Sequence, residues 1–177
     1  MRLTGAQIAG LIPHSGAMCL LDGVLDWDAR RILCMSRSHH AADNPLRADG
    51  RLPAMCGVEY AVQAMAVHGG LAGNIEGRPR AGYLASLRDV ECRGERLDDL
   101  AGDLIVEAEQ IAGDGAQVMY RFKLRVGELE VLSGRALVVL DAAGHQRAFH
   151  FAVPAASSTT RARPLSTSSS PTRSLKR

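Results

Sequence analysis

The pattern of apolar positions predicts one long buried helix over residues 53–70. Small or apolar side chains occupy nearly every face of this stretch, which is typical of a helix that is buried all round. Pro53 fits the first helical turn, where its missing N–H costs nothing, and Gly69-Gly70 is a predicted C-terminal stop. One carboxylate and one amide, Glu59 and Gln63, lie four residues apart on the same helix face. A buried carboxylate is costly unless it is paired, neutralised or used, so Glu59 is the leading candidate for chemistry.

Alternating and apolar-rich runs predict strands on both sides of this helix. Before it, a short helix capped by Thr4, a turn and two strands are expected; after it, a loop and four strands joined by hairpin turns. The predicted ranges are 4–11, 12–16, 18–27 and 31–38, then 70–80, 81–92, 102–112, 117–126 and 129–140. In the strand at 117–126, Arg121, Lys123 and Arg125 share one face, which predicts that this face is solvated. The order predicts an α+β fold in which an antiparallel sheet covers one helix and pairs with a second sheet in a dimer.

Charge and composition divide the chain at about residue 150. All 19 acidic residues precede it, against 16 basic ones (21 minus the five in 151–177), so the predicted domain at 1–150 offers no basic nucleic-acid surface. Residues 151–177 are rich in Ser, Thr and Pro and contain no acidic residue, which predicts a disordered basic tail, either an interaction arm or an extension without function. No apolar run is long enough to span a membrane and no secretory signal pattern is present, so a cytoplasmic protein is expected. The four cysteines show no metal-binding spacing and predict buried free thiols.

Two motifs resemble those of the hot-dog-fold 3-hydroxyacyl-[acyl carrier protein] dehydratases. Ile12-Pro-His-Ser-Gly-Ala-Met-Cys-Leu-Leu-Asp-Gly-Val24 is similar to the family's N-terminal signature, in which Leu-Pro-His and a short turn precede an apolar pair, Asp and Val. The second signature, a helix opened by Pro and followed by Glu-x-x-x-Gln, matches Pro53, Glu59 and Gln63.

The C-terminal half follows the same family in element order. Residues 81–90 stand for the strand that lines the acyl tunnel, with Leu84 and Ser86 among its predicted lining residues, and residues 98–107 stand for a Pro-Gly-Asp turn and its strand. The resemblance covers roughly 8–141 and looks closest to the divergent dehydratase-like proteins of aryl-polyene-type pathways. It implies a hot-dog fold, a homodimer or a heterodimer with another hot-dog subunit, and a substrate on the phosphopantetheine arm of acyl carrier protein. It implies no metal or redox cofactor.

The family's catalytic His is missing from its usual place. In the family it lies in a Gly-His-Phe-Pro motif fourteen residues before the helix carboxylate; here that position is Pro45, or Arg51 if the loop is shortened. His14, in the first signature, is a candidate replacement, although a turn-stabilising role is an alternative. His39 and His40, in the loop before the helix, are further candidates, with solvent-exposed loop histidines as the alternative.

Dehydration requires a base near C2, an acid near C3 and donors for the thioester carbonyl. By resemblance Glu59 is the helix carboxylate and Gln63 orients it; the alternative is that Glu59 pairs with an Arg such as Arg88 purely for stability. The amides of Ala54 and Met55, at the helix start, are predicted to receive the thioester oxygen. Arg51 is either a contact for the phosphate of the phosphopantetheine arm, a residue that steers an acidic carrier protein, or an exposed loop residue.

Three functions remain open from the sequence. The first is dehydration of 3-hydroxyacyl thioesters to trans-2-enoyl products in fatty-acid or polyene-type biosynthesis. The second is a non-catalytic partner of an active hot-dog dehydratase, motivated by the missing motif His. The third is thioester hydrolysis by a water held at Glu59, against which the first signature argues.

Overall fold

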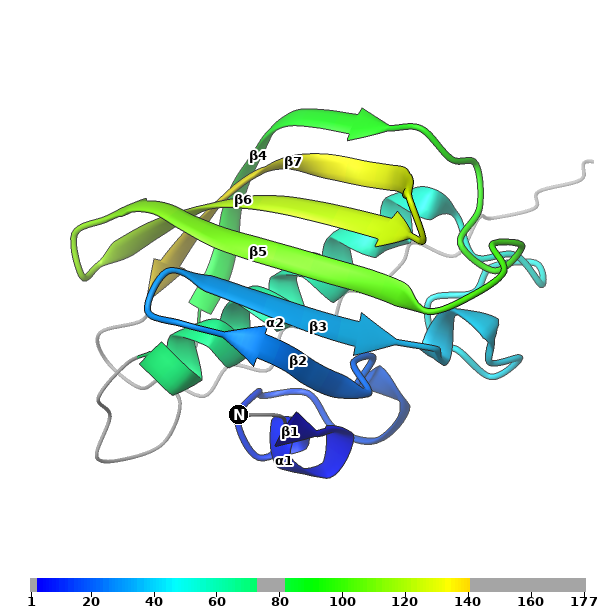
Figure 1. Ribbon diagram of the computed structural model, residues 1–177, viewed down its shortest axis with the longest axis horizontal. Coiled ribbons are helices and arrows are strands. Elements are labelled where there is room, and N and C mark those ends of the chain that lie inside the picture. Colours follow the sequence, from blue (N-terminus) through cyan, green and yellow to red (C-terminus); the bar gives the residue numbers. More distant parts are fainter. Residues whose placement is uncertain (1–2, 73–81, 141–177) are drawn as a thin grey trace, which may run out of the picture. The chain divides into compact units, whose positions relative to one another are not determined.

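The computed structural model describes residues 3–72 and 82–140 and contains a seven-stranded antiparallel sheet that curves around one long helix (Figure 1). The strands are β1 (Leu3–Thr4), β2 (Gly23–Trp27), β3 (Arg31–Ser36), β4 (Gly82–Cys92), β5 (Leu104–Gly113), β6 (Gln117–Val126) and β7 (Leu129–Leu140). The helices are α1 (Gly5–Ala9) and α2 (Gly57–Ala72), with 3-10 turns η1 (Gly16–Met18), η2 (Ser38–His40) and η3 (Ala54–Cys56). The predicted hot-dog architecture is confirmed. The expected boundary near residue 150 and the tail at 151–177 lie outside the described residues.

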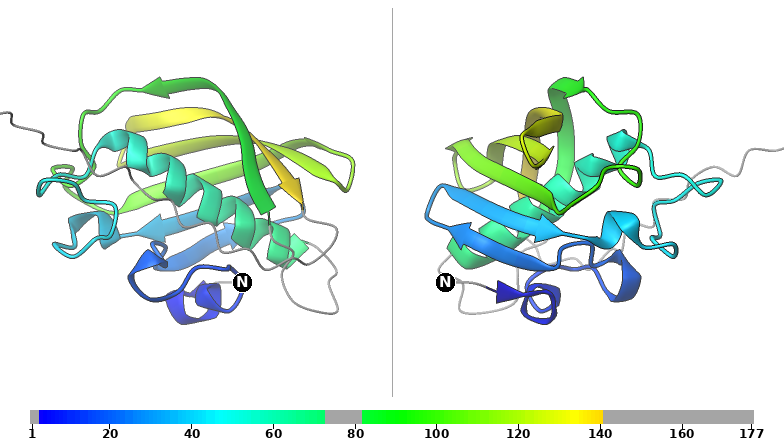
Figure 2. Two further views of the ribbon diagram at one scale, coloured as in Figure 1. Left: turned by 180° about the vertical axis from the view of Figure 1, so that it is seen from behind. Right: turned by 45° about the vertical axis from the view of Figure 1, so that its right-hand side comes forward.

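The sheet order is β1-β2-β3-β5-β6-β7-β4, so β4 is an edge strand. Every pair is antiparallel, and β5, β6 and β7 are joined in sequence by hairpins. α2 lies against the concave face of the sheet (Figure 2) and contacts β3, β5 and β6. On the opposite face Arg121, Lys123 and Arg125 are exposed, as their alternation along β6 predicts.

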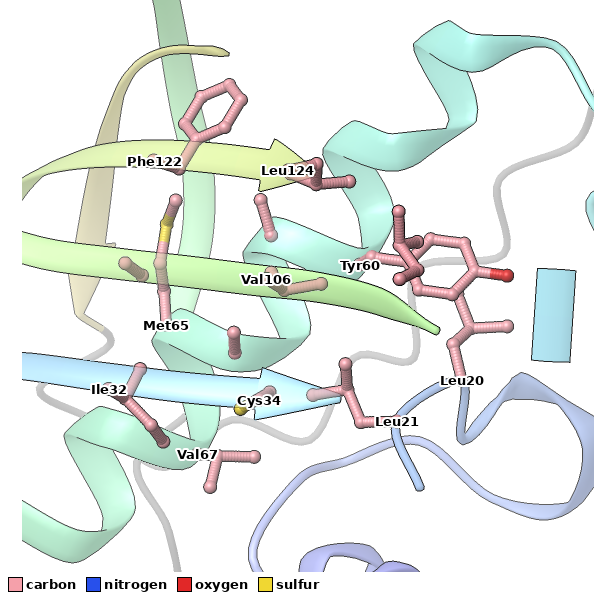
Figure 3. Packing of buried hydrophobic residues seen from close by; sticks show 14 of the residues in the cluster. Leu20, Leu21, Ile32, Cys34, Tyr60, Met65, Val67, Val106, Phe122 and Leu124 are labelled. Atoms are coloured by element: carbon pink, nitrogen blue, oxygen red, sulfur yellow. The ribbon is translucent and has the colours of Figure 1, made fainter. Parts of the chain in front are cut away.

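The core is aliphatic because the chain has few aromatic residues. Residues of α2 such as Tyr60, Met65 and Val67 pack against the inward side chains of the sheet, among them Val106 and Phe122 (Figure 3). All five are at most 3% exposed. This packing fixes the position of α2 relative to the sheet, and with it the position of every side chain that the helix carries.

The helix start differs from the expected one. Residues Ala54–Cys56 form a 3-10 turn, α2 proper begins at Gly57, and the predicted stop at Gly69-Gly70 is wrong because the helix continues to Ala72. The expectation of burial on every face is also wrong. Three apolar residues of one face, Val58, Val62 and Ala66, are only half-buried, and nearby Met55 is 50% exposed.

The first long strand is shorter than predicted, beginning at Gly23 rather than at Met18. The backbone of Leu20 is bound by side chains instead of by a neighbouring strand: its N–H donates to Gln63 Oε1 and its carbonyl accepts from Ser36 and Ser38. These bonds, with the end of η1 at Met18, hold residues 18–20 against α2. Among the described residues, no helix is long and apolar enough to cross a membrane.

Gly57 is expected to be required for the close approach of α2 to the sheet. A Cβ at this position would lie 2.7 Å from Leu124 Cδ2 and 2.9 Å from Leu132 Cδ2, both in the core. We expect Gly57→Ala to lower the free energy of unfolding by about 1 kcal/mol or more, measured by urea denaturation. Gly69→Ala is the matched control in the same helix, because a Cβ there meets nothing within 4 Å. It should be neutral or stabilising, by up to about 1 kcal/mol; equal destabilisation by both substitutions would contradict this account.

Candidate active site

Two of the predicted site residues, His14 and Glu59, lie in direct contact. His14 Nε2 is 3.1 Å from Glu59 Oε1, and the two side chains are 24% and 27% exposed. Glu59 projects from the first turn of α2, and His14 from the turn that precedes η1. Both therefore come from a single chain. Glu59 does not pair with Arg88, which lies exposed on β4 opposite Arg135.

Gln63 connects this pair to the segment at residues 18–20, at the end of η1. Its Nε2 donates to Met18 O at 2.8 Å and to Glu59 Oε1 at 3.1 Å, while its Oε1 accepts from Leu20 N–H at 3.0 Å. A backbone acceptor and a backbone donor thus face the two ends of the amide, so its orientation is fixed. Since Gln63 is fully buried, Glu59 is held by a side chain that has no freedom to turn.

The contacts of Glu59 set its protonation state. Burial of the carboxyl works to raise its pKa, but the hydrogen bonds from His14 and Gln63, with the charge of His14, outweigh burial, so the pKa lies below its ordinary value of 4.5. The carboxylate is consequently ionised at neutral pH, and His14 Nε2 must carry the hydrogen that it donates. Both donors reach the same oxygen, Oε1. Among residues 3–72 and 82–140, Oε2 has no hydrogen-bond partner.

The second ring nitrogen of His14 is unusual. Nδ1 is buried and has no hydrogen-bond partner within the described part of the chain. Nε2 faces the carboxylate, so the unpartnered atom is the ring nitrogen on the side away from Glu59 Oε1. Buried polar atoms without partners are rare in folded proteins and are often found at catalytic sites.

The pair formed by His14 and Glu59, called the dyad below, predicts a measurable pH response. In protein labelled with [δ-13C]glutamate, the Glu59 carboxyl, assigned through Glu59→Gln, is expected to titrate below pH 4.5. His14→Asn removes one of the two donors while burial persists, so the Glu59 pKa should rise. An unchanged Glu59 titration in folded His14→Asn protein would show that the contact does not control this carboxyl.

The start of α2 is held by an ion cluster around Asp98. The carboxylate accepts from Arg47 Nη1 at 2.8 Å, from Arg96 Nη2 at 2.6 Å and from Leu52 N–H at 3.1 Å, and it is 5% exposed. The hydrogen bond from Arg96 is the largest cause of a pKa well below the usual range for this carboxyl. Leu97 N–H also donates to Leu52 O at 2.8 Å. The loop that leads into the helix is therefore tied to the segment after β4.

Only one of the two predicted helix-start amides is free. Ala54 N–H donates to Glu95 O at 2.9 Å, which corrects the expectation that it is available for a thioester oxygen. This N–H is therefore bound to the segment after β4 and does not point freely out of the helix start. No partner is recorded for Met55 N–H among the described residues, and the Met55 side chain is half-exposed.

The remaining candidate residues lie away from the contact between His14 and Glu59. Arg51 is exposed, and its backbone pairs with Ala48. Ser86 is half-buried on β4 opposite Leu137, and no contact with the dyad is recorded. His40 Nε2 lies 3.1 Å from Gly102 O. His39 is fully buried, contrary to the expectation of an exposed loop histidine, and it lies near the backbone of Leu100 and Gly102, with its ring tilted against that of His40.

The described residues do not enclose the contact between His14 and Glu59, whose side chains are 24% and 27% exposed. Two surface hollows of the described chain lie elsewhere, one over Glu109 and Arg121 on the outer sheet face and one beside the β5–β6 hairpin at Gly113. Beside Glu59 the apolar face of α2 remains half-exposed. An acyl chain bound there would need a further wall.

Comparison with known families identifies the chain. Residues 6–148 match the model of the ApeP-like family, described as ApeP dehydratase. The chain belongs to the ApeP-like dehydratase family. This agrees with the resemblance of the two motifs to hot-dog dehydratases. Comparison with curated protein sequences found no match.

Solved structures support the hot-dog fold of this ApeP-like chain. One similar structure is the dehydratase heterocomplex ApeI:P from Xenorhabdus doucetiae, with a TM-score of 0.67 and 20% identity over 76% of this chain and 90% of that one. A homologue of HP0420 from Helicobacter felis has a TM-score of 0.54 and 12% identity, over 76% and 88% of the two chains. The PaaI protein of E. coli has a TM-score of 0.53 and 9% identity over the same shares. At these identities the likeness concerns the fold alone.

Proposed function

We propose that this chain dehydrates 3-hydroxyacyl thioesters on acyl carrier protein to trans-2-enoyl thioesters, in fatty-acid or polyene-type biosynthesis. The observation that carries the proposal is the contact of His14 with Glu59 on the central helix of an ApeP-like dehydratase. This contact places an imidazole beside the helix carboxylate, even though Pro45 or Arg51 occupies the place of the family's usual motif His. The reason for considering the chain a non-catalytic partner is thereby weakened.

In the proposed reaction, ionised Glu59 uses its free oxygen, Oε2, to take the proton from C2. The electron pair of the broken C–H bond forms the C2=C3 double bond, and the C3–O bond breaks. The leaving hydroxyl takes a proton back from the dyad and departs as water. His14 and Glu59 return to their starting state, so the step needs no co-reactant. His14 holds the carboxylate in place and keeps it ionised between turnovers.

The thioester carbonyl gains negative charge as the C2 proton leaves, so a donor aimed at it lowers the barrier. We assign this role to Met55 N–H at the helix start, where the helix dipole adds positive potential. Arg51, exposed on the loop that leads to the helix, is the proposed contact for the phosphate of the carrier's arm. Ser86 on β4 remains a proposed lining residue of the acyl site.

A second hot-dog subunit is proposed as the missing wall of the site. β4 is an eleven-residue edge strand, and its apolar residues Leu84 and Leu87 are each 38% exposed. Unpaired edge strands of this length are normally covered. The similar structure from Xenorhabdus doucetiae is a dehydratase heterocomplex, which supports a heterodimer over a solitary chain. We place the partner along β4, where it would also cover the half-exposed face of α2.

The proposal is tested by incubating the purified protein with 3-hydroxyacyl carrier protein, alone and with a second hot-dog subunit, and following the carrier by mass spectrometry. Loss of one water from the acyl group is the expected result. Release of free acid would instead assign thioester hydrolysis. An unchanged carrier in both mixtures would contradict the proposed function.

A further inference from the structure

A chain of buried and partly buried hydrogen bonds runs from the loop after β3 to the candidate base. It begins at Asn44, whose Nδ2 donates to Tyr60 OH at 2.9 Å. Tyr60 OH lies 2.9 Å from Ser38 Oγ, and Ser38 Oγ donates to Leu20 O, also at 2.9 Å. On the other side of Leu20, its N–H donates to Gln63 Oε1, and Gln63 Nε2 donates to Glu59 Oε1.

The direction of each bond follows from counting hydrogens. Ser38 Oγ has one hydrogen, and the Leu20 carbonyl can only accept it. Tyr60 OH accepts from Asn44 Nδ2, which can only donate, so we direct the Tyr60 hydrogen to Ser38 Oγ, which also lies 3.0 Å from Ser36 Oγ. Donation runs from Asn44 through Tyr60 and Ser38 to Leu20, then from Leu20 N–H through Gln63 to the carboxylate. The two halves meet at the Leu20 backbone, whose carbonyl and N–H belong to different peptide groups, so they are linked through the position of residue 20.

Tyr60 occupies the middle of this chain. It follows Glu59 in α2, and it is fully buried, with its ring in the apolar cluster and its hydroxyl beyond the cluster's edge (Figure 3). Asn44 also donates to Ser38 O at 2.9 Å, so the Tyr60 hydroxyl lies at the junction of the loop and the segment at residues 18–20. That segment presents to Gln63 both backbone groups that fix its amide.

We infer that Tyr60 is a positioning residue for Glu59, acting through Ser38, the Leu20 backbone and Gln63 rather than by touching the substrate. The inference rests on the proposed function for its catalytic consequence. The effect of the Tyr60 hydroxyl on the environment of the Glu59 carboxyl does not depend on the proposed function. Ser36 provides partial support, since its Oγ also donates to Leu20 O at 2.5 Å, so the loss of Tyr60 OH weakens the chain without removing it.

The test compares Tyr60→Phe with Tyr120→Phe. Tyr120 is a matched control: it is a buried tyrosine whose hydroxyl has one strong partner, His68 Nδ1 at 2.9 Å, and which lies on β6 outside the chain of bonds. In Tyr60→Phe the Glu59 carboxyl, followed by its [δ-13C] signal, is expected to titrate at higher pH, because its hydrogen-bond donors are less firmly held. The kcat for dehydration should fall about five- to tenfold, the value of one lost hydrogen bond, with KM little changed. Tyr120→Phe should change neither quantity.

The Glu59 titration and the kcat for dehydration together distinguish a failure of the proposed function from a failure of this inference. If the wild-type protein shows no dehydration, the proposed function fails, yet the titration still decides the role of Tyr60. A folded Tyr60→Phe protein whose Glu59 titrates as in wild type, or an equal shift in Tyr120→Phe, would overturn the inference. If Tyr60→Phe does not fold, Ser38→Ala interrupts the same chain one step later and should raise the Glu59 pKa in the same direction; no rise there would also overturn it.

Discussion

Glu59→Gln is expected to lower kcat for dehydration by about a thousandfold or more, within the range lost when a general acid–base group is removed. The amide has nearly the same shape, and its oxygen can still accept from His14 and Gln63, so the fold should survive. It cannot take a proton from C2. The measurement is single-turnover conversion of 3-hydroxyacyl carrier protein, alongside thermal unfolding.

The control for this variant is Glu107→Gln, on the outer face of the sheet, where the carboxylate lies 3.8 Å from exposed Arg31. It should retain wild-type kcat. A folded Glu59→Gln protein with a kcat near that of wild type would remove Glu59 from the mechanism, whatever the control showed.

His14→Ala is expected to lower kcat by about a hundredfold, because the carboxylate loses the donor that orients it and keeps it ionised. The two residues contact each other within one chain, so a second chain cannot supply the missing imidazole. Mixing His14→Ala chains with Glu59→Gln chains, by co-expression with different tags, should therefore restore no activity. Recovery in the mixed assembly would mean that the site is shared between chains.

His40→Ala is the matched histidine control. His40 is exposed, and its ring contacts Gly102 O rather than Glu59. A loss of activity equal to that of His14→Ala would contradict the assignment of the functional histidine to the N-terminal turn alone.

The strands were the most predictable part of this molecule. Both 117–126 and 129–140 match the structure residue for residue, because alternation and the Gly127-Glu128 turn mark their ends clearly. The helix start was less predictable, since a 3-10 turn and an α-helix favour the same residues. The strand predicted from Met18 failed for a tertiary reason: the backbone at Leu20 is bound by side chains that come from elsewhere in the sequence.

The candidate site was predictable in identity but not in geometry. The motifs pointed to Glu59, Gln63 and His14, whereas the contact between His14 and Glu59 depends on how residues 14–20 lie against α2. Tyr60 was missed because a tyrosine in an apolar helix normally signals packing. Its only signal in the sequence was its position, directly after the one buried carboxylate in a helix otherwise nearly free of polar groups.

The most direct test of the account asks which subunit carries the chemistry. This chain would be paired with a second hot-dog subunit, and the helix carboxylate would be replaced by Gln in one subunit at a time. Dehydration of 3-hydroxyacyl carrier protein would then be followed by mass spectrometry. The account predicts that water is lost when this chain keeps Glu59 and the partner is altered, and that the loss stops when Glu59→Gln is present. Loss of water that depends on the partner's carboxylate and persists with Glu59→Gln would contradict it.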